Sequence, residues 1–143
     1  NGAWGHLDAS WLWRGEFGRQ VFNNTALVYS TKGNALQSKN FLRAALSDPT
    51  GLREPAIYSS RWIENGRFIR LQNATVGYTM TLPGKLGVRT TRLYVSGDNL
   101  LLFTPYSGYD PEVFTDVGTA SRGVDYLTYP RARTFTLGAH VGF

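Results

Sequence analysis

The chain has 143 residues, a formal net charge of +5, 14% aromatic residues and no cysteine. The lack of cysteine excludes disulfides, thiolate metal sites and thiol catalysis within this sequence. No run approaches the roughly 20 consecutive apolar residues of a transmembrane helix, and the mean hydropathy of -0.25 agrees. The basic residues are scattered and do not form the stripe with stacking aromatics that nucleic-acid binding requires, so we expect no nucleic-acid partner.

The first predicted strand covers residues 4–17, where apolar and polar side chains alternate. One face carries Leu7, Ala9, Trp11, Trp13 and Phe17, and the other carries His6, Asp8, Ser10, Arg14 and Glu16. Leu12 is the one apolar residue on the polar face. This regular alternation of apolar and polar side chains indicates a strand with one face towards water and one apolar face.

Residues 18–60 show no sustained alternation, so we expect a long connection there. Within it, Ser38 is placed to cap a short helix that runs through Leu46, and the Asp-Pro-Thr-Gly sequence at residues 48–51 predicts a turn. A connection this long is unusual in a compact soluble domain. It is ordinary on the outer side of a membrane barrel.

The second strand is predicted over residues 61–82, and its alternation changes parity along the way. Ile69 and Leu71 are odd-numbered, whereas the apolar residues of the segment 74–82 are even-numbered. We therefore expect a β-bulge near Gln72, because a bulge lets one strand exchange its two faces.

The rest of the chain predicts a turn, a third strand, a loop and a closing strand. A tight turn at Pro83-Gly84 leads to a strand over residues 88–104, and a Gly- and Tyr-rich loop over residues 105–129 precedes a strand at residues 134–143. A strand of about 9–11 residues crosses a bilayer with lipid-facing and lumen-facing positions alternating. The edge strand of a soluble β-sandwich shows the same alternation, so the closing strand alone leaves both classes open.

The connections between the strands are long, short and long in turn. Transmembrane barrels have short periplasmic turns and long outer loops, which places the Pro83-Gly84 turn and the C-terminal residue on the periplasmic side. Four strands cannot close a barrel, for which about eight are needed, and an open sheet in lipid would leave backbone groups unpaired. We therefore predict an all-β fold, with about four antiparallel strands of a large transmembrane β-barrel and two long extracellular loops.

Five sequence runs in residues 61–143 point to a known family, by their order and spacing. They are Trp62-Ile-Glu-Asn-Gly-Arg-Phe-Ile-Arg-Leu-Gln-Asn73, Val76-Gly-Tyr78, Leu93-Tyr-Val-Ser-Gly-Asp-Asn-Leu100, Tyr106-Ser-Gly-Tyr-Asp-Pro-Glu112 and Phe135-Thr-Leu-Gly138. These runs resemble the C-terminal end of the SusC/RagA-type TonB-dependent transporters of the Bacteroidetes outer membrane. Residues 1–60 fit the preceding strand and outer loop more loosely, with Phe22-Asn23 as a local match.

The resemblance implies a barrel of about 22 strands, of which residues 1–143 are the C-terminal segment. It also implies an N-terminal plug, a SusD-type surface lipoprotein as a lid, and import of oligosaccharides or peptides powered through TonB. The plug and the TonB-contacting segment are absent from these residues, so contact with TonB would run through a missing N-terminal region. The chain begins Asn-Gly-Ala-Trp without the features of a signal peptide, so either a leader was removed or the chain is the tail of a longer one.

The loop that follows the third strand holds candidates for contacts with a ligand or with the lid. Aromatic rings can stack on sugars, and carboxylates can accept hydrogen bonds from sugar hydroxyls. The same residue types also build turns, in which Asp110 would accept hydrogen bonds from nearby backbone amides. The tyrosines of the later part fit an interfacial girdle equally well. The candidates are Tyr106, Tyr109, Asp110, Glu112, Tyr126 and Tyr129.

Charges near the second strand and the C-terminal aromatic are further candidates. Glu64, Arg67 and Arg70 are expected in a lumenal ion-pair network or in contact with substrate, because a charge that faces lipid costs ~2–4 kcal/mol near the midplane. Phe143 resembles the C-terminal aromatic residue that the barrel-assembly machinery recognises in outer-membrane proteins. The alternative is that its side chain only faces the outer-membrane lipid, and both roles can hold at once.

We predict no enzyme, no metal and no cofactor. His6 and His140 are the only histidines, and no further ligands are spaced to join them. A pair of carboxylates can catalyse hydrolysis of glycosidic bonds. The Asp and Glu residues of the last loop could pair in this way, but such residues are common in any solvated loop. They are Asp110, Glu112, Asp116 and Asp125.

Two other classes remain open. One is a soluble β-sandwich module, for instance for carbohydrate binding, which would bury Trp11, Trp13, Leu137 and Val141 against a second sheet. The other is a porin-like barrel without TonB coupling, which the sequence upstream of this chain would distinguish.

Overall fold

The structure is a computed structural model that describes residues 1–31, 33–47, 57–82, 89–113 and 123–143. It divides into two compact units. Unit 1 consists of Asn1–Glu16, Phe68–Phe103 and Arg131–Phe143, and unit 2 consists of Phe17–Arg67 and Thr104–Pro130. The predicted turns at residues 48–51 and at Pro83-Gly84 lie outside the described residues.

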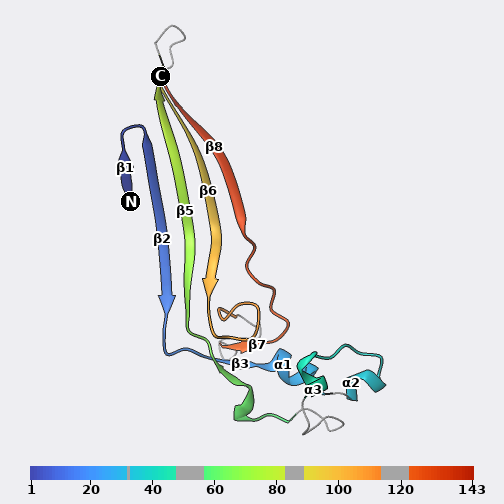
Figure 1. Cartoon of the computed structure of the whole chain (residues 1–143). Helices are drawn as coiled ribbons and strands as arrows, with labels where there is room; N and C mark the ends of the chain where they lie inside the picture. The colour runs from blue at the N-terminus through green and yellow to red at the C-terminus, as the bar shows by residue number, and fades with distance from the viewer. Residues whose placement is uncertain (32, 48–56, 83–88, 114–122) are drawn as a thin grey trace. The chain divides into compact units, whose positions relative to one another are not determined.

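Unit 1 is one antiparallel sheet of five strands (Figure 1). Their order across the sheet is β1, β2, β5, β6, β8, and each pairs antiparallel with its neighbour. The bounds are Gly2–Trp4 for β1, Leu7–Glu16 for β2, Phe68–Thr81 for β5, Thr90–Phe103 for β6 and Thr134–Gly142 for β8. The four long strands expected from the sequence are thus confirmed, and β1 is an addition.

The start of the first strand differs from the prediction. Gly5 and His6 form a turn that folds β1 back onto β2, so the strand does not run unbroken from residue 4. Gly5 has a φ of 59°, a left-handed conformation that glycine adopts without a Cβ clash. His6 therefore belongs to a turn and not to the polar face of a strand.

The predicted bulge is present. The pairing of β5 with β6 shifts between Leu71 and Asn73, and the pairing of β2 with β5 shifts at the same place. Gln72 consequently has no Cα partner in either ladder. The extra residue moves the apolar set of β5 from odd to even positions, which keeps one face of the sheet apolar along its length.

The register of the sheet sorts side chains into apolar and polar rows. Ala9, Val76, Val95 and Leu137 are successive partners across β2, β5, β6 and β8. One residue along, Ser10, Thr75, Ser96 and Thr136 form the next row. Neighbouring rows point to opposite faces of a pleated sheet, so one face is apolar and the other is polar. The apolar face is uncovered, with Leu137 at 81% exposure.

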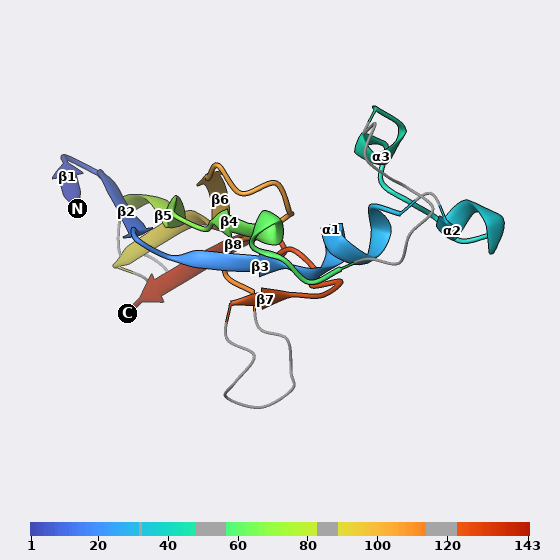
Figure 2. The ribbon, with the colours of Figure 1, turned by 90° about the horizontal axis from the view of Figure 1, so that it is seen from below.

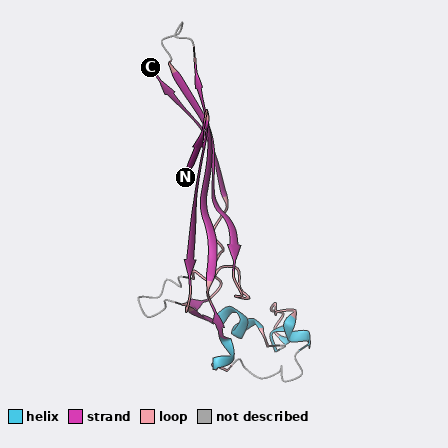
Figure 3. Cartoon of the chain, turned by 60° about the vertical axis from the view of Figure 1, so that its left-hand side comes forward, coloured by secondary structure: helices cyan, strands magenta, loops and turns pink. Residues whose placement is uncertain are grey.

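Unit 2 combines a small sheet with short helices. Its strands are β3 (Gln20–Asn23), β4 (Ile63–Asn65) and β7 (Val124–Asp125), and β3 lies between the other two (Figure 2). Its helices are α1 (Asn24–Tyr29), α2 (Gly33–Leu36), α3 (Ala44–Ser47) and the 3-10 turn η1 (Ser60–Trp62). All helices of the described chain belong to this unit (Figure 3), and none of them is long and apolar enough to cross a membrane.

Two predictions for this region are wrong. Residues 18–60 contain β3 and three α-helices and are not a plain connection. The helix predicted from Ser38 through Leu46 is present only as α3, which begins at Ala44, so Ser38, with a φ of 56°, is not its N-cap. The predicted strand over residues 61–82 is two strands, because the chain leaves β4 at Gly66 before β5 begins. A Cβ at Gly66 would lie 2.6 Å from Cγ2 of Val21, so the close approach of the chain to β3 at this point requires glycine.

The core of unit 2 is small. Val21 of β3 is fully buried together with Tyr106 and Val113 from the segment after β6. Tyr106 and Val113 lie far from Val21 in the sequence, so the core ties the two segments of unit 2 to each other.

Candidate functional site

The polar face of the sheet carries a row that alternates large residues with glycines. Asp8, Gly77, Tyr94 and Gly138 are successive partners across β2, β5, β6 and β8. A Cβ at Gly138 would collide with the Tyr94 ring, and a Cβ at Gly77 would lie 2.6 Å from the Asp8 carboxylate. Each glycine therefore leaves the space that a neighbouring side chain occupies.

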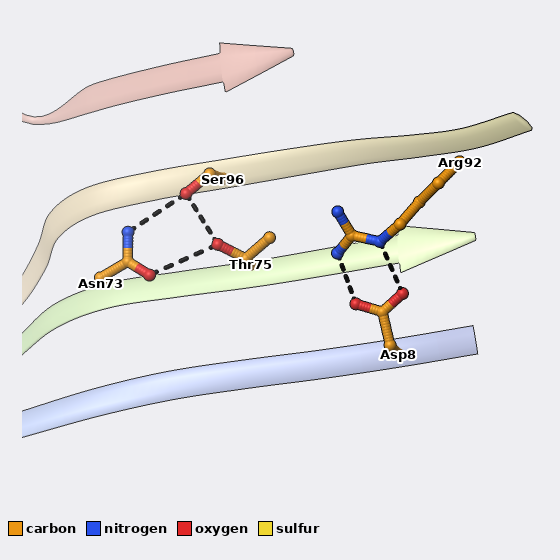
Figure 4. A network of polar contacts seen from close by, with 5 residues as sticks. All are labelled: Asp8, Asn73, Thr75, Arg92 and Ser96. Atoms are coloured by element: carbon orange, nitrogen blue, oxygen red, sulfur yellow. Dashed lines mark hydrogen bonds and ion pairs between the residues drawn. The ribbon is translucent and has the colours of Figure 1, made fainter. Parts of the chain in front are cut away.

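Arg92 of β6 reaches across β5 to Asp8 of β2 (Figure 4). Its Nε donates to Asp8 Oδ1 at 2.9 Å and its Nη2 donates to Oδ2, which makes a two-pronged ion pair. The guanidinium also lies 5.2 Å from the centroid of the Tyr94 ring, a cation–π distance. Two non-adjacent strands are thereby joined through side chains.

A second polar cluster lies on the same face between β5 and β6 (Figure 4). The Asn73 amide donates to Ser96 Oγ at 3.1 Å and to Asp98 Oδ1 at 2.8 Å. The hydroxyls of Thr75 and Ser96 are 2.8 Å apart. Side chains of this kind hydrogen-bond each other and water equally well, so the face suits an aqueous space and not a packed apolar core.

In unit 2, Glu64 of β4 holds two other segments. One carboxylate oxygen accepts hydrogen bonds from Asn23 Nδ2 at 2.9 Å and from Ser107 Oγ at 2.8 Å. The other accepts from the Ser107 backbone N–H at 2.9 Å. Asn23 is itself the N-cap of α1, because its Oδ1 accepts from Ala26 N at 2.7 Å.

Asp125 of β7 is a second anchoring carboxylate. Its Oδ2 accepts a hydrogen bond from the buried hydroxyl of Tyr106 at 2.5 Å, and its Oδ1 accepts from Thr128 N at 3.3 Å. Burial of the ring, together with this hydrogen bond and the negative charge of Asp125, raises the pKa of Tyr106 well above its usual range. Both groups therefore stabilise the loop.

A hollow of about 680 Å³ opens in unit 2 beside these anchors. Ligand sites in proteins commonly have volumes of about 300–1,000 Å³. The hollow is lined by residues of β3, α1 and β7 and by the segments 40–42, 107–109 and 127–130; its largest side chains are Tyr29, Phe41, Leu42, Tyr109, Leu127 and Tyr129. We refer to this site as the unit 2 hollow.

The six loop candidates fall into two groups. Tyr106, Asp110 and Glu112 are buried, and the predicted turn role of Asp110 is confirmed, because its Oδ1 accepts from Glu112 N at 2.9 Å. Tyr109, Tyr126 and Tyr129 are exposed at 78%, 45% and 92%. Of these three, Tyr109 and Tyr129 line the unit 2 hollow and Tyr126 does not.

The three candidate charges are divided between the two units. Arg70 belongs to β5 and is buried at 2% exposure, with its guanidinium 5.5 Å from the Phe68 ring centroid. Glu64 and Arg67 belong to unit 2, where the backbone carbonyl of Arg67 accepts a hydrogen bond from Thr104 Oγ1 at 2.8 Å. Phe143 follows the end of β8 and is exposed.

Other residues of the hollow escaped the sequence analysis. Tyr29, Phe41, Leu42 and Leu127 lie in stretches without alternation, where no periodic signal marks a face. The described residues contain no cluster of three His, Asp or Glu side chains that could hold a metal ion, and Asp116 lies outside them.

A twisted antiparallel sheet with one uncovered apolar face, one polar face and an unclosed outer edge defines a segment of a β-barrel. The sequence comparison agrees. The chain is 34% identical to TonB-dependent receptor P3 of Formosa agariphila over 151 aligned residues, which cover 96% of the chain and 15% of the relative. It is 34% identical to TonB-dependent receptor SusC of Bacteroides thetaiotaomicron, with 80% of the chain and 12% of the relative covered. No protein-family model matches the chain.

The chain therefore belongs to the SusC/RagA-type TonB-dependent receptors, a family of outer-membrane β-barrels, and it spans about one seventh of the length of the relatives it matches. Solved structures share its fold. Structures of the RagAB peptide transporter and of its "open-open" state superpose with TM-scores of 0.79 and 0.76, at 22% identity, over 99% of the chain and 16% of the solved chain. The expected antiparallel barrel-segment fold is thus confirmed.

Proposed function

We propose that the chain is a wall segment of an outer-membrane importer that takes up oligosaccharides or peptides, powered through TonB. The observation that carries this proposal is the division of one sheet into an uncovered apolar face and a hydrogen-bonded polar face. An apolar face of this size costs little in contact with lipid and much in contact with water. The polar face then lines the lumen through which a nutrient passes.

The connections of the sheet support an orientation. In an antiparallel sheet, the long connections β2–β5 and β6–β8 leave from one end and the short connection β5–β6 from the other. Long outer loops and short periplasmic turns are the rule for such barrels, so the end from which the long connections leave is the extracellular one. We accordingly assign residues 1–143 to the C-terminal part of the barrel domain, with Phe143 on the periplasmic side as a signal for the assembly machinery.

The candidate residues take different parts in this proposal. Asp8, Arg92 and Arg70 carry lumenal charges on the sheet, whereas Glu64 and Arg67 hold the loops. Tyr109, Tyr126 and Tyr129 are exposed, and they are available to a ligand or to a SusD-type surface lipoprotein that closes the barrel as a lid. The names of the relatives, a SusC and a RagAB transporter, favour such a partner.

Two rival classes make different predictions. A soluble β-sandwich would need a second apolar sheet layer over Trp11 and Leu137, both of which are exposed. A porin-like barrel would pass nutrients without energy, so its transport would not depend on TonB. The first rival is tested by detergent dependence and the second by removal of TonB.

Nutrient dependence of a host strain tests the proposal. The gene for the full-length protein is deleted, or TonB is removed, and growth is measured on maltooligosaccharides or on casein peptides as the sole carbon source. We expect growth on at least one source to fail in both strains. The plasmid-borne protein should restore growth in the strain that lacks its gene but not in the strain that lacks TonB. Undiminished growth of both strains on both sources would contradict import. Growth that needs the protein but not TonB would establish the porin-like alternative.

A further inference from the structure

We propose that the unit 2 hollow binds an aromatic or aliphatic side chain of a short peptide. This inference rests on the proposed import function and narrows its substrate class for this one site. Two features of the described lining carry the inference: its walls are mainly aromatic and aliphatic, and its buried polar groups are already occupied.

The walls of the hollow come from separate parts of unit 2. Tyr29 ends α1, Phe41 and Leu42 lie between α2 and α3, and Leu127 and Tyr129 come from the segment after β7. The Leu42 backbone N–H donates to Tyr29 O at 2.7 Å, which fixes these two walls relative to each other. Such a lining gains most from a ligand that removes apolar area from water.

The buried polar residues of the lining serve the protein itself. Asn23 bonds Glu64, Ser107 and the start of α1. Thr25 Oγ1 donates to Asp125 O at 3.3 Å and accepts from Leu127 N at 2.8 Å. These groups cannot serve the hydroxyls of a glycan without giving up bonds that hold the loop.

The charge of the lining also restricts the ligand. Asp125 is the one charged residue in the described part of the lining, and its carboxylate accepts hydrogen bonds from Tyr106 and Thr128. Because this charge is negative and buried, an anionic group such as a uronate or a sulfate is disfavoured. The exposed side chain of Asn40, also in the lining, offers an amide N–H donor group and a carbonyl acceptor, which suits the backbone of a peptide whose apolar side chain enters the hollow.

Photo-crosslinking locates the binding site directly. The full-length transporter is purified from outer membranes and incubated with the capped tripeptide Ser-Bpa-Ser, where Bpa is benzoylphenylalanine, then illuminated and mapped by mass spectrometry. We expect crosslinks in the segments 40–42 and 127–130. Capped Ser-Phe-Ser should suppress them at concentrations at least about ten-fold lower than capped Ser-Ser-Ser, because burial of one aromatic side chain contributes enough free energy for such a factor.

Matched variants connect the crosslink to the hollow. Tyr129→Ser should weaken the competition by Ser-Phe-Ser about ten-fold, as truncation of an aromatic contact commonly does. Tyr58→Ser, at an exposed tyrosine of unit 2 outside the described lining, should leave the competition unaltered. Crosslinks confined to other segments, equal effects of both variants, or stronger competition by maltotriose than by Ser-Phe-Ser would each overturn the inference. Loss of TonB-dependent growth does not enter this assay, so the import proposal and the peptide site can fail separately.

Discussion

Asp8 of β2 and Arg92 of β6 form a two-pronged ion pair across strand β5, over the one position of β5 where glycine leaves room for it. A Cβ at Gly77 would lie 2.6 Å from Arg92 Nε and equally close to Asp8 Oδ1. The ion pair therefore joins β2 to β6 across β5 on the polar face, and it depends on Gly77 for the space that it occupies (Figure 4). Its consequences can be measured on the full-length protein in detergent.

Removal of one partner of the ion pair should lower the stability of the sheet. Arg92→Gln leaves Asp8 without its paired donors, so we expect a lower urea midpoint of unfolding than for the unchanged protein. The exchange Asp8→Arg with Arg92→Asp keeps opposite charges facing each other and should recover part of the loss. If the exchange variant is no more stable than the single variants, the pair does not contribute through its charges.

The same face predicts a steric effect at Gly138. Gly138→Val should destabilise the sheet by about 1–3 kcal/mol, the usual cost of overpacking, because the new side chain meets the Tyr94 ring. Gly2→Val is the matched control, since no atom lies within 4 Å of a Cβ there. Urea unfolding of the two variants measures the difference, and equal stability would show that Tyr94 moves aside without cost.

The cap of α1 predicts a local effect in unit 2. Asn23→Ala removes the acceptor for Ala26 N, and loss of an N-cap costs about 0.5–2 kcal/mol. It also removes the donor to Glu64. We expect faster proteolysis within residues 24–47 of the native full-length protein. Asn23→Asp keeps the cap but sets a carboxylate against Glu64, so recovery of full resistance by this variant would show that the cap alone matters.

The buried hydroxyl of Tyr106 predicts a pH dependence. The pKa of Tyr106 is raised above the ordinary value of 10.0, so the folded protein favours the protonated phenol more than the unfolded chain does. The resulting stability is fully present below about pH 10 and is lost as the pH rises towards the folded-state pKa. Urea unfolding at about pH 8 and pH 11 should therefore show a larger decrease for the unchanged protein than for Tyr106→Phe. Equal decreases would contradict this role.

Much of unit 1 can be predicted from the sequence, because a strand with one polar and one apolar face shows an alternation of polar and apolar residues in its sequence. The alternation of residues 134–143 and the parity change at Gln72 both survive in the structure as β8 and as the bulge. The sequence does not predict the turn at Gly5, because β1 has only 3 residues. So short a strand shows no alternation of its own, and the change of parity between Trp4 and Leu7, which pair across the turn, does not stand out in the sequence.

Unit 2 was less predictable for a different reason. Its short elements are held by contacts between residues far apart in the chain, such as Asn23 with Ser107 at 3.2 Å and Tyr106 with Asp125. Helices of four to six residues have little stability of their own, so local patterns such as the one at Ser38 do not decide where they form. The buried state of Tyr106, Asp110 and Glu112 is likewise set by tertiary packing, which separates them from the exposed tyrosines of the same loop.

The placement of the apolar face in lipid is the central claim, and two adjacent residues of β8 test it. Leu137 belongs to the apolar row with Val95, and Thr136 belongs to the polar row with Ser96. The full-length protein is expressed with Leu137→Arg or with Thr136→Arg, and the folded fraction in outer membranes is measured by heat-modifiable mobility. We expect Leu137→Arg to abolish or strongly reduce insertion, since arginine in hydrocarbon costs ~2–4 kcal/mol near the midplane, and Thr136→Arg to insert normally. Equal insertion of both variants, or the reverse order, would contradict the orientation of the sheet.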